Sequence, residues 1–349
     1  MKASVAELTA LRQFRLMEAP LPDPAPGEVQ VRIEAVGICG SDLHSYAEGA
    51  VGDTPCRYPM VLGHEPAGTV VKAGAGVSGW NAGDAAAFEP AIYCYHCEFC
   101  HTGHHNVCAR LRFMSMPGDP GFFRDHANLP AANLIPIPPG LGVREATIIE
   151  PLAVVMHSMK FAALNLAETA AVFGAGPIGL MTVICLKLAG AGRVWSIEPV
   201  AARRELARAA GADAAIDPLA VDPAREILRD TGGRGVDVAI DCAAIGGSVN
   251  HCLHAARHAG RVVITGIPVE REVAVDFSPM RRKELTVYNV RRSNHESLAA
   301  RDLLAANLAR FAAMITHTRP LGRIAEALDM VEHRADGVGK LIILPHSSA

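Results

Sequence analysis

Ala171-Val172-Phe173-Gly174-Ala175-Gly176-Pro177-Ile178-Gly179 lies near the middle of this 349-residue chain and indicates its fold class. The three apolar residues predict a buried strand, and the pattern of residues 178–188 predicts a helix. In the G-x-G-x-x-G pattern between them, the glycines allow a tight turn, close approach of a pyrophosphate, and close packing of helix on strand. Pro177 is tolerated at the helix start, where amides and the helix dipole favour an anion. We therefore expect a dinucleotide at Gly174, Gly176, Pro177, Ile178 and Gly179, the alternative being a strand–helix turn without a ligand.

The same rhythm of strand and helix continues on the C-terminal side of this stretch. Strands are predicted over residues 193–197, 214–216, 236–240, 261–265 and 287–290, and helices over residues 201–210, 223–229 and 248–258. Gly211 is predicted to cap the helix before it. Alternating strands and helices indicate right-handed βαβ units, and so a doubly wound parallel sheet of the Rossmann type.

An acidic residue follows the second strand of this unit. Glu198 lies 19 residues after Gly179, where a carboxylate bonds ribose hydroxyls and repels a 2′-phosphate. This position predicts NAD rather than NADP, with Arg203 as a further cofactor residue. Arg203 or Arg204 could instead accommodate a 2′-phosphate. Thr265, Gly266 and Ile267, after the fifth strand, are also assigned to the cofactor.

The first 150 residues are β-rich and irregular. Residues 28–36 alternate polar and apolar side chains, which predicts a half-buried strand, and shorter strands are expected at residues 67–73 and 84–88. At the other end of the chain we expect helices over residues 296–310 and 321–332 and a closing strand over residues 341–344.

Composition excludes several classes of protein. The formal net charge is −3, which offers no basic surface for nucleic acid or anionic lipid. The longest apolar stretch, residues 170–186, is too short to span a membrane and contains glycines and a proline. No secretory signal precedes Glu7. We expect a cytoplasmic protein with neither a nucleic-acid nor a membrane partner.

Four of the nine cysteines are close together in the sequence. Cys94-x2-Cys97-x2-Cys100-x7-Cys108 supplies four thiolates on a short loop, which suits a closed tetrahedral Zn²⁺ site. Such a site has a structural role. Four free thiols, or a nearby histidine in place of one cysteine, are the alternatives.

Five motifs occur in the order found in zinc-containing medium-chain dehydrogenases/reductases, which this chain resembles essentially from end to end. They are Val36-Gly37-Ile38-Cys39-Gly40-Ser41-Asp42-Leu43-His44, Gly63-His64-Glu65-Pro66-Ala67-Gly68, the four-cysteine loop, Glu150-Pro151-Leu152-Ala153-Val154 and Gly174–Gly179. The Glu150 motif is most similar to the sorbitol and xylitol dehydrogenase branch.

The resemblance implies an organisation and a mechanism. It implies a GroES-like catalytic domain over residues 1–153 with a structural-zinc lobe near 90–110, a Rossmann domain over 154–291, and a return to the catalytic domain over 292–349. A second, catalytic Zn²⁺ would be held by Cys39, His64 and Glu65, with Glu150 as a ligand or a partner of the water beside the metal. Ser41 and His44 match the proton relay of the family. The implied cofactors are two Zn²⁺ per subunit and NAD, and the implied assembly is a homodimer or homotetramer.

Two departures weaken the substrate assignment within this branch. Ser45 replaces an aromatic residue, and Arg291-Arg292 replaces an Arg-Tyr pair, so a carboxylate or phosphate on the substrate is plausible. We predict oxidation of a secondary alcohol of a polyol or sugar derivative, with Arg291 and Arg292 at the substrate. A threonine, sugar-acid or sugar-phosphate dehydrogenase is the alternative enzyme, and a nucleotide-binding sensor is the alternative that is not an enzyme.

Overall fold

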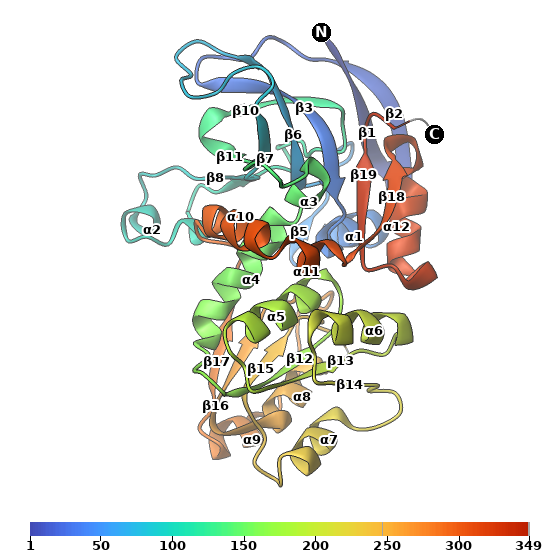
Figure 1. The fold of residues 1–349 in the computed structure, drawn as a ribbon. Coiled ribbons are helices and arrows are strands. Elements are labelled where there is room, and N and C mark those ends of the chain that lie inside the picture. The colour runs from blue at the N-terminus through green and yellow to red at the C-terminus, as the bar shows by residue number, and fades with distance from the viewer. Residues whose placement is uncertain (246, 348–349) are drawn as a thin grey trace. The chain divides into compact units, whose positions relative to one another are not determined.

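The computed structural model describes residues 1–245 and 247–347. The chain forms two compact units (Figure 1). One consists of Met1–Ala153 and Asn294–Ala349, and is called here the catalytic unit; the other is Val154–Ser293, called here the nucleotide unit. Helix α4 (Ile149–Ala162) contains the boundary between them.

The nucleotide unit is built on a six-stranded parallel sheet in the order β14-β13-β12-β15-β16-β17. Its strands are β12 (Thr169–Phe173), β13 (Arg193–Ile197), β14 (Ala214–Ile216), β15 (Val236–Asp241), β16 (Ala256–Ile264) and β17 (Thr286–Asn289). Its helices are α5 (Pro177–Leu188), α6 (Ala201–Ala210), α7 (Pro223–Asp230), α8 (Ser248–Ala255) and α9 (Phe277–Arg282). Strand order reverses at β12, which is where ligands bind in such sheets. The predicted α/β fold class is confirmed.

The helices lie in pairs, with α5 beside α6 and α7 beside α8 (Figure 1). Helix α6 ends where it was predicted to end, because Gly211 adopts a left-handed conformation (φ 112°) and caps it. Helix α7 begins at Asp222, whose side chain accepts hydrogen bonds from the amides of Ala224 and Arg225. The expected helix over residues 248–258 was too long, because the backbone at Ala256 is already extended and begins β16.

The catalytic unit contains a seven-stranded sheet with the path β11-β7-β6-β3-β19-β18, and β10 pairs with β3. The strands are β3 (Glu28–Gly37), β6 (Glu65–Ala73), β7 (Ala85–Phe88), β10 (His126–Pro130), β11 (Leu134–Pro136), β18 (Ile315–Pro320) and β19 (Lys340–Leu344). A large apolar core packs on this sheet. Because β19 pairs with β3, a strand from the end of the chain lies beside one from near its start.

Smaller elements complete the catalytic unit. They are the hairpins β1 (Lys2–Ala10) with β2 (Gln13–Pro20) and β4 (Ala50–Val51) with β5 (Thr54–Pro55), the pair β8 (Ala91–Ile92) with β9 (Arg112–Phe113), helices α1 (Gly40–Ala47), α2 (Glu98–His101), α3 (Val143–Ala146), α10 (Ser297–Ala306), α11 (Leu308–Ala312) and α12 (Ile324–Glu332), and 3₁₀ turns at His105–Val107, Ala131–Asn133, Leu321–Arg323 and Ala335–Gly337.

Two predicted helices of the C-terminal segment are divided. The helix expected over residues 296–310 breaks at Asn307, whose side-chain amide donates to the carbonyl of Leu303 (3.0 Å) and so competes with the helix. The helix expected over residues 321–332 begins with a 3₁₀ turn that contains Gly322, and α12 follows it.

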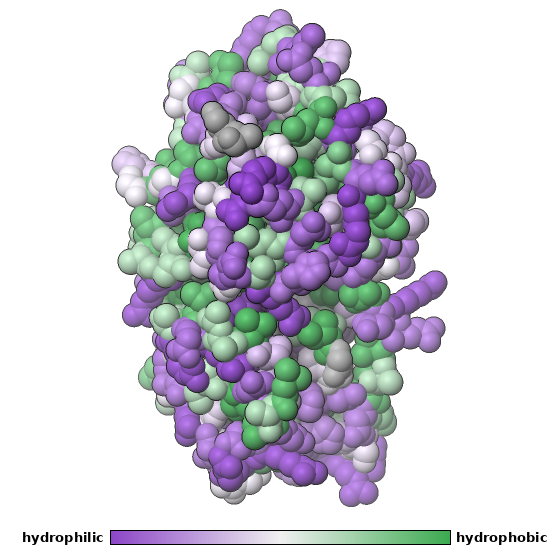
Figure 2. Space-filling model, turned by 90° about the vertical axis from the view of Figure 1, so that its right-hand side faces the viewer, coloured by the Kyte–Doolittle hydropathy of each residue, from purple (hydrophilic) through white to green (hydrophobic). Residues whose placement is uncertain are grey.

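The described helices include none with the length and apolar character needed to cross a bilayer. On the face drawn in Figure 2, hydrophobic residues are interspersed among hydrophilic ones.

Candidate active site, zinc lobe and cofactor loop

Cys39, His64 and Glu65 are brought together in the catalytic unit. Each offers a donor atom, and these three atoms lie within 4.8 Å of one another. Antiparallel pairing of β3 with β6 places Gly37 opposite Glu65, so the end of one strand and the start of the other meet. Cys39 then caps helix α1. Strand pairing therefore explains how residues dispersed in the sequence form one group.

Asp42 supports two of these residues at once. Its Oδ2 accepts the amide of Cys39 (3.0 Å), and its Oδ1 accepts the amide of Gly63 (3.0 Å) and lies 3.4 Å from His64 Nδ1. The hydroxyl of Ser115 approaches the same oxygen at 3.4 Å. Burial opposes ionisation of Asp42, but His64 and these amides lower its pKa overall. Carboxylates in this position orient histidine ligands of metals.

The three donors fit a metal cation. Thiolate, imidazole and carboxylate are all ligands of Zn²⁺ in catalytic sites. Burial lowers the pKa of His64, but the charges of Asp42 and Cys39 raise it well above its ordinary value. The donor group is thus an anionic environment that favours a positive charge.

Ser41 and His44 lie on helix α1, one turn apart. Ser41 Oγ is 3.3 Å from His64 Nε2, so this hydroxyl is next to the donor group. His44 Nδ1 is 3.1 Å from Glu48 Oε2, on the next turn. The geometry places the first relay residue at the donors and gives the second a carboxylate partner.

Glu150 lies in the first turn of α4 and is not among the three converging donors. Burial raises its pKa to about 8, and the nearby carboxylates Glu65 and Glu89 add to the rise while His64 opposes it. Glu150 is thus close enough to the donors to respond to their charges. Glu89 also accepts a hydrogen bond from the Ser297 hydroxyl (2.5 Å), and no sequence pattern predicted a role for Glu89.

Lys340 contacts one of the donors and was not predicted either. Its ammonium group donates to Glu65 Oε2 and to the carbonyl of Ile38 (3.0 Å). A buried lysine 275 residues away in the chain cannot be assigned to a site from local sequence alone.

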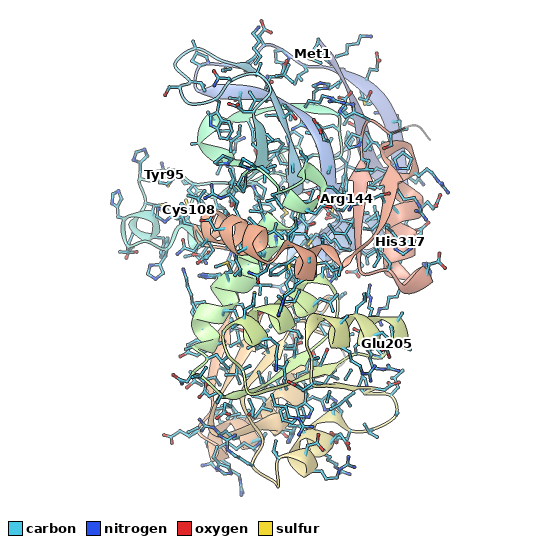
Figure 3. All side chains as sticks on the ribbon, viewed as in Figure 1. Met1, Tyr95, Cys108, Arg144, Glu205 and His317 are labelled. Carbon is cyan, nitrogen blue, oxygen red and sulfur yellow. The ribbon has the colours of Figure 1, made fainter. Side chains whose placement is uncertain are left out.

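The four-cysteine lobe lies between β8 and β9, and Figure 3 labels Cys108 and Tyr95 on it. The Sγ–Sγ distances are 3.4 Å for Cys94–Cys108, 3.9 Å for Cys97–Cys108 and 4.0 Å for Cys94–Cys100. These separations suit four thiolates around one tetrahedral Zn²⁺. Backbone amides lower the pKa of Cys97 to about 6, whereas burial raises that of Cys100 to about 12.

The glycine-rich loop joins β12 to α5 in the nucleotide unit. Gly174 has φ 95°, and a Cβ at Gly179 would overlap the carbonyl of Gly174. A Cβ at Gly176 would meet no atom within 4 Å, so the backbone is open to a ligand there. No side chain caps the start of α5, where Pro177 occupies the first turn. A helix start without a side-chain cap, beside open space, fits a pyrophosphate.

Glu198 is buried and faces this loop. Its carboxylate accepts the amides of Ala175 (2.9 Å) and Val200 (3.0 Å). Arg204, the alternative residue for a 2′-phosphate, donates through its guanidinium to the backbone carbonyls of Glu198 and Pro199 and lies 3.1 Å from Asp217. Arg203 is buried on α6.

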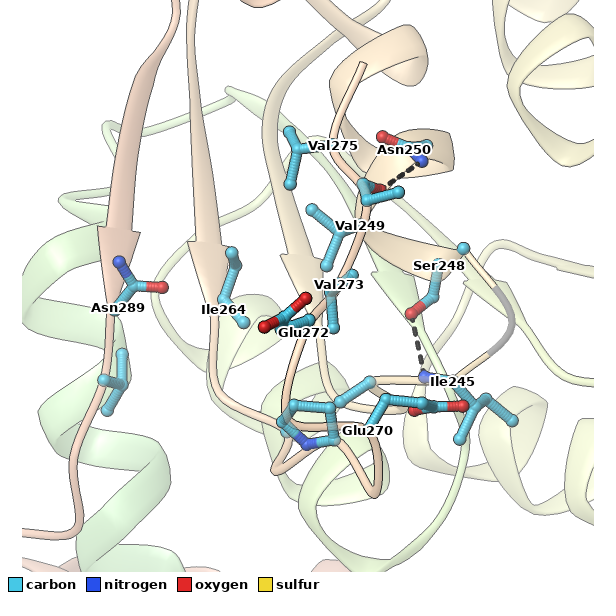
Figure 4. Close-up of a pocket in the computed structure, with 16 residues that line it drawn as sticks. Ile245, Ser248, Val249, Asn250, Ile264, Glu270, Glu272, Val273, Val275 and Asn289 are labelled. Atoms are coloured by element: carbon cyan, nitrogen blue, oxygen red, sulfur yellow. Dashed lines mark hydrogen bonds between the residues drawn. The ribbon is translucent and has the colours of Figure 1, made fainter. Parts of the chain in front are cut away.

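A hollow of about 560 Å³ lies at the carboxyl ends of β15, β16 and β17 (Figure 4). Apolar side chains of Val249, Ile264 and Val273 line it, together with Glu270 and Glu272. Figure 4 shows two hydrogen bonds beside the hollow. The Ser248 hydroxyl accepts the amide of Ile245, and the Asn250 side chain donates to the carbonyl of Ala274, next to Val275.

The residues after β16 and β17 differ in their surroundings. Gly266 lines the hollow, Thr265 Oγ1 is 2.6 Å from Ser158 Oγ, and Ile267 is exposed. Arg291 is exposed, and Arg292 is half-buried with φ 55°. Both arginines belong to the nucleotide unit, and their assignment to the substrate stays a prediction.

Comparison with known proteins identifies the family. Residues 25–139 match the alcohol dehydrogenase GroES-like domain, and residues 177–306 match the zinc-binding dehydrogenase model. Sorbitol dehydrogenase of Bacillus subtilis is 32% identical over 99% of this chain and 98% of its own. L-threonine 3-dehydrogenase of Pyrococcus furiosus is 33% identical over 94% of each chain. A structure from Sinorhizobium meliloti 1021, described as a zinc-binding dehydrogenase bound to NADP, has a TM-score of 0.90 and 30% identity, covering 99% of this chain and 100% of its own. The chain therefore belongs to the zinc-containing medium-chain dehydrogenases/reductases, with polyol dehydrogenases among its relatives.

Proposed function

We propose that this protein is an NAD-dependent zinc dehydrogenase that oxidises a secondary alcohol of a polyol or sugar derivative. The observation that carries the proposal is the convergence of Cys39, His64 and Glu65 within 4.8 Å, in a chain of this family. A second group, Cys94, Cys97, Cys100 and Cys108, supports a structural zinc. When bound, the catalytic zinc supplies an open Lewis-acidic position and the nicotinamide accepts a hydride equivalent.

Side chains of the protein are proposed to carry the proton released from the alcohol to solvent. The distance of 3.3 Å between Ser41 Oγ and His64 Nε2 supports Ser41 as the first acceptor of that proton. His44, whose Nδ1 is 3.1 Å from Glu48 Oε2, is proposed to pass the proton to solvent. Burial and the nearby carboxylates raise the pKa of Glu150 to about 8, which supports a role for Glu150 in holding a proton beside the same group.

In the nucleotide unit, the chain positions the cofactor. The uncapped start of α5 and the open face of Gly176 support binding of the pyrophosphate. Glu198, held by two amides, supports recognition of the ribose hydroxyls, and this favours NAD. The NADP-bound relative supports the competing cofactor.

The relatives favour a polyol as the substrate. The similarity to sorbitol dehydrogenase covers nearly all of the chain. The second candidate substrate is an amino-alcohol, an aldonate or a sugar phosphate, which is supported by the similarity to threonine dehydrogenase and by Arg291-Arg292. A panel of sorbitol, xylitol, an aldonate, a hexitol phosphate and threonine, followed by NADH absorbance, tests this. Oxidation confined to the charged substrates would overturn the polyol proposal.

Zinc content separates the enzyme from a nucleotide-binding sensor. Two Zn²⁺ per chain are expected of the enzyme, and one or none would favour the sensor.

We further propose a homo-oligomer, which is supported by exposed apolar side chains after β16: Ile267, Val269, Val273, Val275 and Phe277. Light scattering in solution tests the assembly. A cytoplasmic location stays a prediction from the sequence.

A further inference from the structure

Lys340 is buried in the catalytic unit, with 2% of its side chain exposed. Lysine is rarely buried to this extent unless its charge is compensated. It lies at the start of β19, in the last segment of the chain, where β19 pairs with β3. A charged residue inside a sheet of apolar core strands requires an explanation other than packing.

The ammonium group of Lys340 contacts both segments that carry metal donors. It donates to Glu65 Oε2, which lies beside His64, and to the carbonyl of Ile38 (3.0 Å), which precedes Cys39. Gly37 leaves the space for this arrangement. A Cβ there would overlap Glu65 Oε2 and would lie 2.8 Å from Lys340 Cε.

The charges of the metal-free site require a cation at this position. Glu65 is 1% exposed, and an ionised carboxylate that is buried without a partner is strongly destabilising. His64 is directed at Asp42, with 3.4 Å between its Nδ1 and Asp42 Oδ1, so that pair does not compensate Glu65. Of the described contacts of Glu65 Oε2, the ion pair with Lys340 provides that compensation.

We propose that Lys340 is a positioning residue that stands in for the metal cation before zinc binds. It holds the Glu65 carboxylate at the donor group, so that zinc enters a site already formed in the folded protein. Once the metal is bound, part of the compensation for Glu65 comes from zinc. This inference rests on the proposed function, because it takes Cys39, His64 and Glu65 as zinc donors.

A packing role and a place-holding role predict different results for Lys340→Met. If Lys340 only fills space, its loss destabilises the metal-free and zinc-loaded proteins equally. If it stands in for the cation, its loss destabilises mainly the metal-free protein, because zinc restores a positive charge beside Glu65.

The experiment compares Lys340→Met with Lys72→Met, an exposed lysine on β6 that pairs with Asp23 (2.8 Å). Thermal unfolding is measured before and after removal of the catalytic zinc by a chelator, with zinc content determined in each sample. In Lys340→Met, the melting temperature of the metal-free form is expected to fall by about 6–12 °C. The zinc-loaded form should fall by less than half as much, because the bound metal then compensates Glu65. Equal losses in both forms, or behaviour like Lys72→Met, would overturn the proposal.

A double variant keeps the proposal testable if Lys340→Met folds poorly. Lys340→Met/Glu65→Gln removes both buried charges, so its metal-free form is expected to be more stable than that of Lys340→Met alone. A double variant as unstable as the single one would show that Lys340 does not act through Glu65, and would also overturn the proposal. Cys39→Ala distinguishes the two levels of inference. If it keeps both zinc ions, the proposed site fails; if it loses one while Lys340→Met behaves like Lys72→Met, only the place-holding role fails.

Discussion

Cys39 brings the third donor to the candidate catalytic site from the junction of β3 and α1, whereas His64 directly precedes β6 and Glu65 begins it. Cys39→Ala leaves two donors, and a catalytic zinc site ordinarily uses three protein ligands. We expect zinc to fall from about two to one per chain and kcat/KM to fall at least ~1000-fold, on the order of 4 kcal/mol. Elemental analysis and steady-state kinetics check this, with Cys56→Ser as a control thiol outside both cysteine groups. Full turnover by Cys39→Ala would contradict the site.

Glu198 determines the expected choice of cofactor. Both of its oxygens accept backbone amides, which fix the carboxylate where we expect the ribose diol of NAD, so that a 2′-phosphate would meet its charge. We predict a preference for NAD of at least ~10-fold in kcat/KM, about 1.4 kcal/mol. Glu198→Ala should reduce that preference, and Glu198→Gln should reduce it while keeping the side-chain size. Equal efficiency of the native enzyme with NAD and NADP would show that Arg203 and Arg204 outweigh the carboxylate.

Asp237 links three strands of the nucleotide unit. On β15, its side chain accepts the amide and hydroxyl of Thr169 on β12 (2.9 and 2.8 Å) and pairs with Arg257 on β16 and with Arg234 (both 2.6 Å). Burial opposes its ionisation, but these partners lower the pKa of Asp237 well below its ordinary value. Asp237→Asn should therefore destabilise this unit by about 2–4 kcal/mol at neutral pH.

The pH dependence of that loss has a defined sign. Because the folded pKa of Asp237 is lowered, its stabilisation is present above the unfolded value, near 4, and disappears as the pH falls below it. The difference between wild type and Asp237→Asn in chemical denaturation should thus shrink from pH 7 toward pH 3, as estimated from the ordinary carboxyl range. Asp302→Asn, which removes an exposed ion pair, is the control. A constant difference across this range would contradict the assignment.

The four-cysteine lobe has little apolar core of its own, with Ala91 and Tyr93 packed against the thiols. Its order should depend on the metal, since structural zinc contributes folding free energy locally. Cys97→Ser is expected to reduce zinc from about two to one per chain and to lower the melting temperature by several degrees, while kcat falls less than in Cys39→Ala. Unchanged zinc content and melting temperature would show that the lobe holds no metal.

At the scale of elements, the sequence predicts the helices and strands whose ends are determined by neighbouring residues. The residues of β13 and α6 were predicted without error, because apolar periodicity and Gly211 define them. Strand β18, Ile-Thr-His-Thr-Arg-Pro, was missed, because its alternation is almost entirely polar and its pairing with β19 is set by the sheet. Helix α1 was missed too, since it is short and is stabilised at its start by Asp42 rather than by a marked apolar face.

The candidate site shows the same limit at longer range. Its donors were proposed from a family resemblance, because no spacing rule joins Cys39 to His64. The register of β3 on β6 supplies that link. Lys340 and Glu89 were missed, because Lys340 contacts Glu65, and Glu89 acts on Glu150, only through pairing or packing between distant segments.

At the scale of the molecule, one unit is contiguous and the other is completed by the end of the chain. The nucleotide unit, Val154–Ser293, contains all six of its sheet strands, whereas β19 of the catalytic unit lies between β3 and β18 and carries Lys340. A chain that ends at Gly339 should therefore lose the thermal transition of the catalytic unit and its catalytic zinc, yet still bind NADH through the glycine-rich loop. A chain that ends at Pro345 retains β19 and should behave like the full chain. Circular dichroism, zinc analysis and NADH fluorescence check the three outcomes. Loss of NADH binding together with the zinc would mean that the nucleotide unit depends on the other for folding, because its own sheet and core would then be insufficient.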